Sequence, residues 1–166
     1  MATKQGDLAL LDDPLAQELL RSTIPARVAY VASDGTPRVV PIWFHWNGTQ
    51  VVLGTPLKAP KVRSLLKNPK VVLTIDSQSW PYKVLQIRGS ARVDTVDGVV
   101  PEYAEAAQRY FGEAQGRAWV DQVRSLFPQM ARIAVQPEWV GILDFETRFP
   151  SAIAAAMSGG ETEGAR

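Results

Sequence analysis

From residue 27 to residue 145 the sequence alternates β-forming runs with turn residues, and it includes one short helical segment between strands and two helical segments late in the chain. The dipeptides Asp34-Gly35 and Asn47-Gly48 separate runs rich in Val, Ile and aromatic residues, and such dipeptides reverse adjacent antiparallel strands. A parallel α/β sheet would instead alternate its strands with long helices. The pattern therefore favours a small antiparallel barrel. We expect strands over residues 27–32, 37–46, 50–54, 70–76, 82–93 and 130–145, with a bulge or a barrel corner at Gly89 and an interruption at Pro137.

Helical patterns flank these strands. Asp13 and Pro14 supply an N-cap and a first-turn proline, and leucines at helical spacing follow them. Asn68-Pro69 ends a second, short helix that lies between two strands. We expect helices from Pro14, from Pro60 to residue 67, and over residues 101–111 and 116–127.

Composition limits the classes of function that the chain can have. It has 166 residues, of which 46% are hydrophobic, and a net charge of +1, which gives no global attraction to nucleic acid or to an anionic membrane. Without Cys the chain has no disulfide or thiolate chemistry, and with one His it has no histidine-rich metal centre. No run approaches the roughly 20 apolar residues of a membrane span. We expect a cytoplasmic protein with a single domain over residues 1–157 and a disordered tail over 158–166.

A basic turn joins the strand at 50–54 to the short helix. Lys58, Lys61 and Arg63 lie in or near the first turn of this helix, where free N–H groups and the helix dipole favour an anion such as a phosphate. The alternative is that the basic residues form the solvated face of an amphipathic helix whose apolar residues face the core.

The run from Pro37 to Trp46 places large apolar side chains on both faces of a strand, because neighbouring residues of a strand alternate. One face would cover the barrel core, and the other would cover a dimer interface or a planar ligand. His45 lies within this run and is expected to be a packed residue. The sequence contains no nucleophile elbow and no glycine-rich nucleotide loop, so it gives no support to a serine triad or to those nucleotide sites.

Four segments in this order and spacing resemble the split-barrel flavoproteins typified by pyridoxamine 5'-phosphate oxidase, particularly the flavin/deazaflavin oxidoreductase branch. They are Asp34 to Trp43, Gly54-Thr55, Lys61 to Leu65 with Asn68-Pro69, and Ile87 to Ala91. The resemblance implies a mainly β (α+β) fold, a split antiparallel β-barrel of the FMN-binding type with a short crossover helix and peripheral helices. It also implies a homodimer in which Trp80, Tyr82 and Trp139 of one subunit line the cofactor site of the other. It places the cofactor ring against Val40, Pro41, Ile42 and Trp43, and the phosphate near Thr55, Lys58, Lys61 and Arg63.

The same resemblance implies hydride transfer between a bound cofactor and a small unsaturated organic substrate. The chain lacks the C-terminal elements of the vitamin B6 oxidases, which makes pyridoxamine phosphate a poor candidate substrate. A basic track at Lys58, Lys61, Arg63, Lys67 and Lys70 favours the deazaflavin coenzyme F420, with its longer anionic tail, and FMN remains open. The alternative is a non-catalytic flavin-binding or interaction module on the same barrel.

Overall fold

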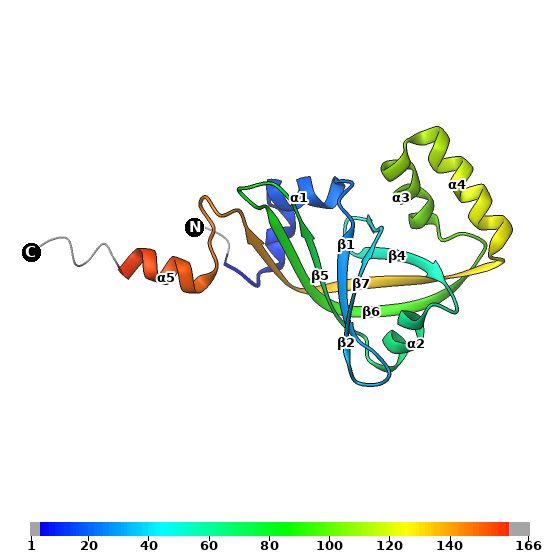
Figure 1. Ribbon diagram of the computed structural model, residues 1–166, viewed down its shortest axis with the longest axis horizontal. Coiled ribbons are helices and arrows are strands. Elements are labelled where there is room, and N and C mark those ends of the chain that lie inside the picture. The colour runs from blue at the N-terminus through cyan, green and yellow to red at the C-terminus, as the bar shows by residue number, and fades with distance from the viewer. Residues whose placement is uncertain (1–3, 160–166) are drawn as a thin grey trace, which may run out of the picture.

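A seven-stranded antiparallel sheet forms the body of the protein, in the order β2-β1-β5-β6-β7-β4-β3. The computed structural model describes residues 4–159 (Figure 1). Within this part, no helix is long and apolar enough to cross a membrane. The elements are η1 (Leu8–Asp12), α1 (Pro14–Arg21), β1 (Ala26–Val31), β2 (Pro37–Ile42), β3 (His45–Trp46), β4 (Val51–Pro56), α2 (Pro60–Lys67), β5 (Lys70–Asp76), β6 (Val84–Asp97), α3 (Pro101–Phe111), α4 (Glu113–Leu126), β7 (Gln129–Leu143) and α5 (Ser151–Gly159).

The two longest strands, β6 and β7, form a ribbon shared by both halves of the sheet. β6 has 14 residues and β7 has 15, and they pair along their whole length. β5 pairs with the first half of β6, and β4 pairs with the first half of β7 (Figure 1). The sheet therefore bends around one continuous ribbon, and its inner face holds the main apolar core.

The expected bulge at Gly89 is confirmed, and it explains why Pro137 does not interrupt β7. Arg88 pairs with Trp139 and Gly89 pairs with Pro137, so Glu138 is the extra residue of β7. A Cβ atom on Gly89 would lie 2.1 Å from the carbonyl oxygen of Gln136, so only glycine fits. Our expectation of a break at Pro137 is wrong because the bulge accommodates the proline within a continuous strand.

The expected strand over residues 37–46 is in fact two strands. β2 ends at Ile42 and β3 begins at His45, and these strands lie at opposite edges of the sheet. The sheet is thus not closed, and we call residues 43–44 the split. The guanidinium of Arg109, on α3, donates a hydrogen bond to the carbonyl oxygen of Phe44 and another, of 3.0 Å, to that of Ser22. A helix side chain, not a strand, satisfies the backbone at the split.

Helices α3 and α4 form a hairpin over the outer face of β4 and β7 (Figure 1). A second apolar cluster, which includes Val52, Val100, Val123 and Met130, fills the space between the hairpin and these two strands. α4 begins three residues earlier than expected because Gly112, with φ of 84°, makes the turn between the two helices. α5 was not expected: residues 158 and 159 belong to it, and the rest of the expected tail lies outside the described residues.

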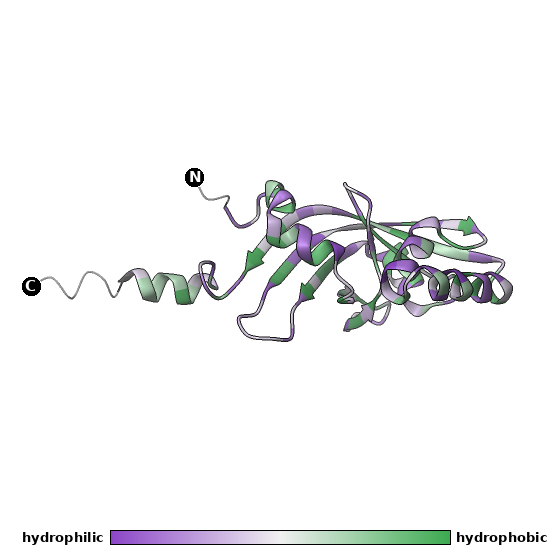
Figure 2. Cartoon of the chain, turned by 90° about the horizontal axis from the view of Figure 1, so that it is seen from above, coloured by the Kyte–Doolittle hydropathy of each residue, from purple (hydrophilic) through white to green (hydrophobic). Residues whose placement is uncertain are grey.

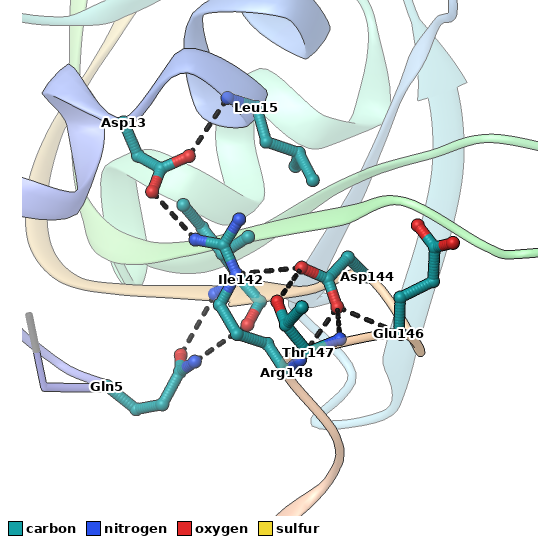
Figure 3. Close-up of polar contacts among 8 residues, drawn as sticks. All are labelled: Gln5, Asp13, Leu15, Ile142, Asp144, Glu146, Thr147 and Arg148. Atoms are coloured by element: carbon teal, nitrogen blue, oxygen red, sulfur yellow. Dashed lines mark hydrogen bonds and ion pairs between the residues drawn. The ribbon is translucent and has the colours of Figure 1, made fainter. Parts of the chain in front are cut away.

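A buried carboxylate holds the chain after β7 in a tight turn (Figure 3). Oδ1 of Asp144 accepts hydrogen bonds from the N–H groups of residues 146, 147 and 148, at 3.0, 2.8 and 2.7 Å. Arg148 pairs with Asp144 at 3.0 Å and with Asp13 at 2.7 Å, and Asp13 also caps α1. Burial raises the pKa of Asp144, but the backbone donors outweigh burial and hold that pKa far below its ordinary value.

Substitution of Gly89 tests the bulge. In Gly89→Ala the new methyl group collides with backbone, which no rotamer change relieves, so we expect a loss of about 3 kcal/mol in the free energy of unfolding. Thr95→Ala, at an exposed position of the same strand, should change it by less than about 0.5 kcal/mol. Urea denaturation measures both variants, and equal stability of the two would contradict a close approach at Gly89.

Asp144→Asn tests the carboxylate turn. The variant loses charged hydrogen bonds, so we expect it to be less stable by about 1 to 3 kcal/mol at neutral pH. Because the folded-state pKa lies below the ordinary value of 3.8, this contribution is present above that value and is lost as the pH falls through the folded-state pKa. Urea titrations from pH 7 downwards should therefore show parent and variant converging below about pH 4. A constant difference across this range would contradict the assignment.

Candidate functional site

A pocket of about 470 Å³ lies beside the split, between the barrel and the α3–α4 hairpin. Its volume is in the range typical of small-molecule sites. The end of β2, the end of β4, α2 and the hairpin all contribute to its lining. The lining residues are Pro41, Ile42, Trp43, Gly54, Thr55, Pro56, Lys61, Tyr103, Trp119, Val123, Leu126, Phe127 and Met130.

One cation lines this pocket among the described residues. Nζ of Lys61 lies 3.4 Å from Oγ1 of Thr55, whose side chain is buried. Burial lowers the pKa of Lys61, and within residues 4–159 no carboxylate forms an ion pair with it. Ala59, the N-cap residue of α2, supplies no side-chain acceptor to the first turn of that helix. The pocket therefore holds a partly desolvated positive charge without a negative partner in the described protein.

The side chain of Trp43 is fixed by aromatic residues of α3. Its ring stacks on Tyr110 with centroids 4.9 Å apart, and Phe111 packs edge-on at 4.8 Å. Tyr103 lies 6.0 Å away on the side of the pocket. Trp43 thus forms a rigid, flat apolar surface at the pocket, and Val40, Ile42 and Phe44 pack on the barrel core as the alternation predicts.

The hairpin residues of the pocket were missed by the sequence analysis. Tyr103 approaches β4 closely because Gly54 lacks a side chain: a Cβ there would lie 2.8 Å from Cβ of Tyr103. The indole N–H of Trp119 donates a 2.8 Å hydrogen bond to the hydroxyl of Tyr103. Glu102 pairs with Arg132 of β7 and so anchors the first turn of α3. Gly54, a small residue in β4, was the available sequence signal for a close contact, but it does not identify the helix that packs there.

The structure brings five of the expected site residues together, namely Pro41, Ile42, Trp43, Thr55 and Lys61, and leaves four outside the pocket lining. Val40 faces the core, and Lys58 is exposed. Arg63 points to another part of the surface, where it contacts the hydroxyl of Ser33 at 3.3 Å. Trp80 packs against Tyr82 and Phe145, which do not line the pocket either.

The basic track on which F420 was favoured is not continuous in space. Lys70 pairs with Glu138 at 2.8 Å on the outer face of the sheet, and Lys67 is exposed at the end of α2. Of the five cations in the track, only Lys61 lines the pocket.

His45 lies in a different depression, with Arg109 and Trp46. Burial, and then the charge of Arg109, lowers the pKa of His45, and its Nδ1 has no hydrogen-bond partner in the described part of the chain. No group of His, Asp and Glu in residues 4–159 is arranged to hold a metal ion.

Comparisons with known proteins agree with this architecture. The sequence profile described as pyridoxamine 5'-phosphate oxidase matches residues 13–144. No curated protein sequence matches the chain. A solved structure named F420 reductase is similar with a TM-score of 0.58 and 26% identity, over 75% of this chain and 94% of that one.

Two further solved structures share the fold at lower identity. A conserved hypothetical protein from Mycobacterium tuberculosis has a TM-score of 0.65 and 18% identity, over 87% of this chain and 91% of that one. The haem storage protein HutZ from Vibrio cholerae has a TM-score of 0.57 and 20% identity, over 80% and 93%. Because the profile covers most of the chain and the sheet has the split that the fold requires, the chain belongs to the pyridoxamine 5'-phosphate oxidase family.

Proposed function

We propose that the chain is an oxidoreductase that binds a flavin-type cofactor in the pocket beside the split, and that this cofactor is F420 in preference to FMN. The observation that carries the proposal is the ammonium group of Lys61, which is partly buried, forms no ion pair with a carboxylate of residues 4–159 and lies beside the hydroxyl of Thr55. A phosphate at this point would supply the missing negative charge and accept hydrogen bonds from both side chains. The flat side chain of Trp43, with Pro41 and Ile42, fits a planar ring next to it.

The protein residues would position the cofactor and exclude water from it. Trp43 is held by three aromatic neighbours, so the ring surface would be rigid before the cofactor arrives. The apolar side chains of Val123, Leu126 and Phe127 also line the pocket. When bound, the cofactor would accept or donate a hydride, and a small unsaturated organic compound would be the substrate. Tyr103 and Lys61 are the residues of the pocket lining that can donate a proton to a bound molecule.

The choice of F420 over FMN rests on the 26% identity to the structure named F420 reductase. Lys61 alone of the basic track lines the pocket, so the longer anionic tail of F420 would extend into solvent beyond it. His45, the single histidine of the chain, does not line this pocket, so a haem group ligated by histidine would not bind there.

Absorption spectra and titrations test the proposal. The purified protein should bind F420 more tightly than FMN, and the bound, reduced cofactor should be reoxidised by some members of a panel of unsaturated compounds. Tight binding without reoxidation by any compound would favour the non-catalytic flavin-binding module. Failure to bind either cofactor would remove the proposed function.

Lys61→Met tests the anion contact. A charged hydrogen bond contributes about 1.5 to 3 kcal/mol, so affinity for F420 or FMN should fall roughly ten- to a hundredfold. Burial lowers the pKa of Lys61 because it disfavours the charged form in the folded protein, so this cost in stability is absent above the ordinary value of 10.5 and is complete once the pH has fallen below the folded-state pKa. Without cofactor at neutral pH, the Lys61→Met variant should therefore be as stable as the parent protein or more stable. Lys67→Met, on the same helix, is the matched control, and equal affinities of the two variants would move the phosphate elsewhere.

Trp43→Ala tests the aromatic surface, and Trp46→Ala is its control because Trp46 packs on the barrel core. The free energy of unfolding should fall in both variants, by up to about 5 kcal/mol. Only Trp43→Ala should also weaken cofactor affinity, by roughly five- to 150-fold for a stacking loss of about 1 to 3 kcal/mol. A fluorescence titration of the folded fraction separates the two effects, and equal affinities would exclude Trp43 from the site.

A further inference from the structure

The last helix of the described chain, α5, extends away from the barrel without covering any part of it (Figures 1 and 2). Residues 151–158 are all exposed, including Ile153 at 45% and Met157 at 56%. The helix has no charged residue, and it is coloured mostly green in Figure 2. A helix of 9 residues is marginal in isolation, and a helix that is apolar on all sides is normally buried. The described residues of the chain leave α5 uncovered, so its apolar side chains call for an apolar surface elsewhere.

The direction of α5 is fixed where it begins. The N–H groups of residues 144 and 145 both donate to the carbonyl oxygen of Arg148, and Asp144 and Asp13 hold its guanidinium (Figure 3). The helix then begins at once, with the N–H of Ile153 bonded to the carbonyl oxygen of Pro150 at 2.9 Å. α5 is thus a projecting segment with a rigid base.

An uncovered aromatic surface lies next to this base. Trp80 packs against Tyr82 and Phe145 with ring centroids 5.4 and 5.7 Å apart, and Phe149 lies 6.4 Å from Phe145. Trp80 is 68% exposed and Tyr82 is 42% exposed. Tyr82 and Phe145 also line a depression of about 520 Å³ together with Gln78 and Val84. We call this surface the aromatic groove.

The backbone conformation of Phe145 is unusual, and it holds one ring of the aromatic groove in place. Its φ of 56° is in the left-handed region, which non-glycine residues seldom adopt, and the hydrogen bonds around Asp144 hold it there. This conformation keeps the ring of Phe145 between Tyr82 and Phe149.

If two copies of the chain are related by a two-fold axis, the projecting apolar helix of each copy can reach the apolar groove of the other. A helix of 9 residues is about 13 Å long, so two such helices that run antiparallel bring the tip of each to the base of the other. Each tip then meets the aromatic groove of the second copy, which is an isologous contact. A groove on an unrelated partner would bury the apolar side chains of α5, but it would leave Trp80 and Tyr82 exposed. We propose that α5 is an exchanged segment, which in a homodimer packs into the aromatic groove of a second copy.

Sedimentation of the full chain, at concentrations from nanomolar to micromolar, tests the exchange. The parent should be a dimer, and Ile153→Glu with Met157→Glu should raise its dissociation constant at least a hundredfold, because both apolar side chains would lose their burial. α5 does not contribute to either core cluster, so the variant should keep the parent's circular dichroism. A monomeric parent, or a dimer that the two glutamates do not weaken, overturns the proposal.

Disulfide trapping identifies the surface that α5 contacts, and the absence of natural cysteine makes the readout simple. The variant Met157→Cys with Gln78→Cys should give a covalent dimer on oxidation. The control, Met157→Cys with Gln122→Cys, carries its second thiol on the exposed face of α4 and should not. A covalent monomer from the first variant would show that α5 folds back on its own groove, and dimers from both or neither would exclude the groove. Each of these results overturns the exchange.

Discussion

The close approach of Gly89 to the carbonyl oxygen of Gln136 determines the shape of the whole sheet. It produces the bulge that lets the long β6–β7 ribbon bend without losing its pairing on either side. One half of the ribbon then carries β5, β1 and β2, and the other half carries β4 and β3. Since both halves share the same two strands, the two outer edges of the sheet are brought toward each other, and the chain can pass from one edge to the other through residues 43 and 44.

This passage is also what creates the candidate site. A closed barrel would satisfy the backbone at residues 43 and 44 by strand pairing, whereas here Arg109 donates to Phe44 from α3. The hairpin must therefore pack close to the split, and Gly54 allows Tyr103 to do so. The pocket is the space that remains between a sheet edge and a helix pair that replaces strand pairing.

The sequence predicted the order of elements well because alternation, turn dipeptides and the bulge glycine are local signals. It failed at residues 43–44, where the alternation of faces continues although the strand changes edges. It also placed Lys61 and Arg63 in one site, yet residues two apart on a helix point about 200° apart. Tyr103 and Trp119 could not be predicted as site residues, because an amphipathic pattern shows that a helix face is buried without showing which strand covers it.

Two lysines near α2 show how the surroundings of a charge distinguish a structural role from a binding role. Lys70 is exposed and forms an ion pair with Glu138, so its charge is satisfied within the chain and contributes little to stability. Lys61 is partly buried beside a neutral hydroxyl, which lowers its pKa and makes the charged form less favourable in the folded protein. An anion bound at Thr55 would reverse that cost, because a charge already removed from water attracts an opposite charge more strongly. The same desolvation that weakens the unliganded protein at neutral pH therefore favours a phosphate at this position.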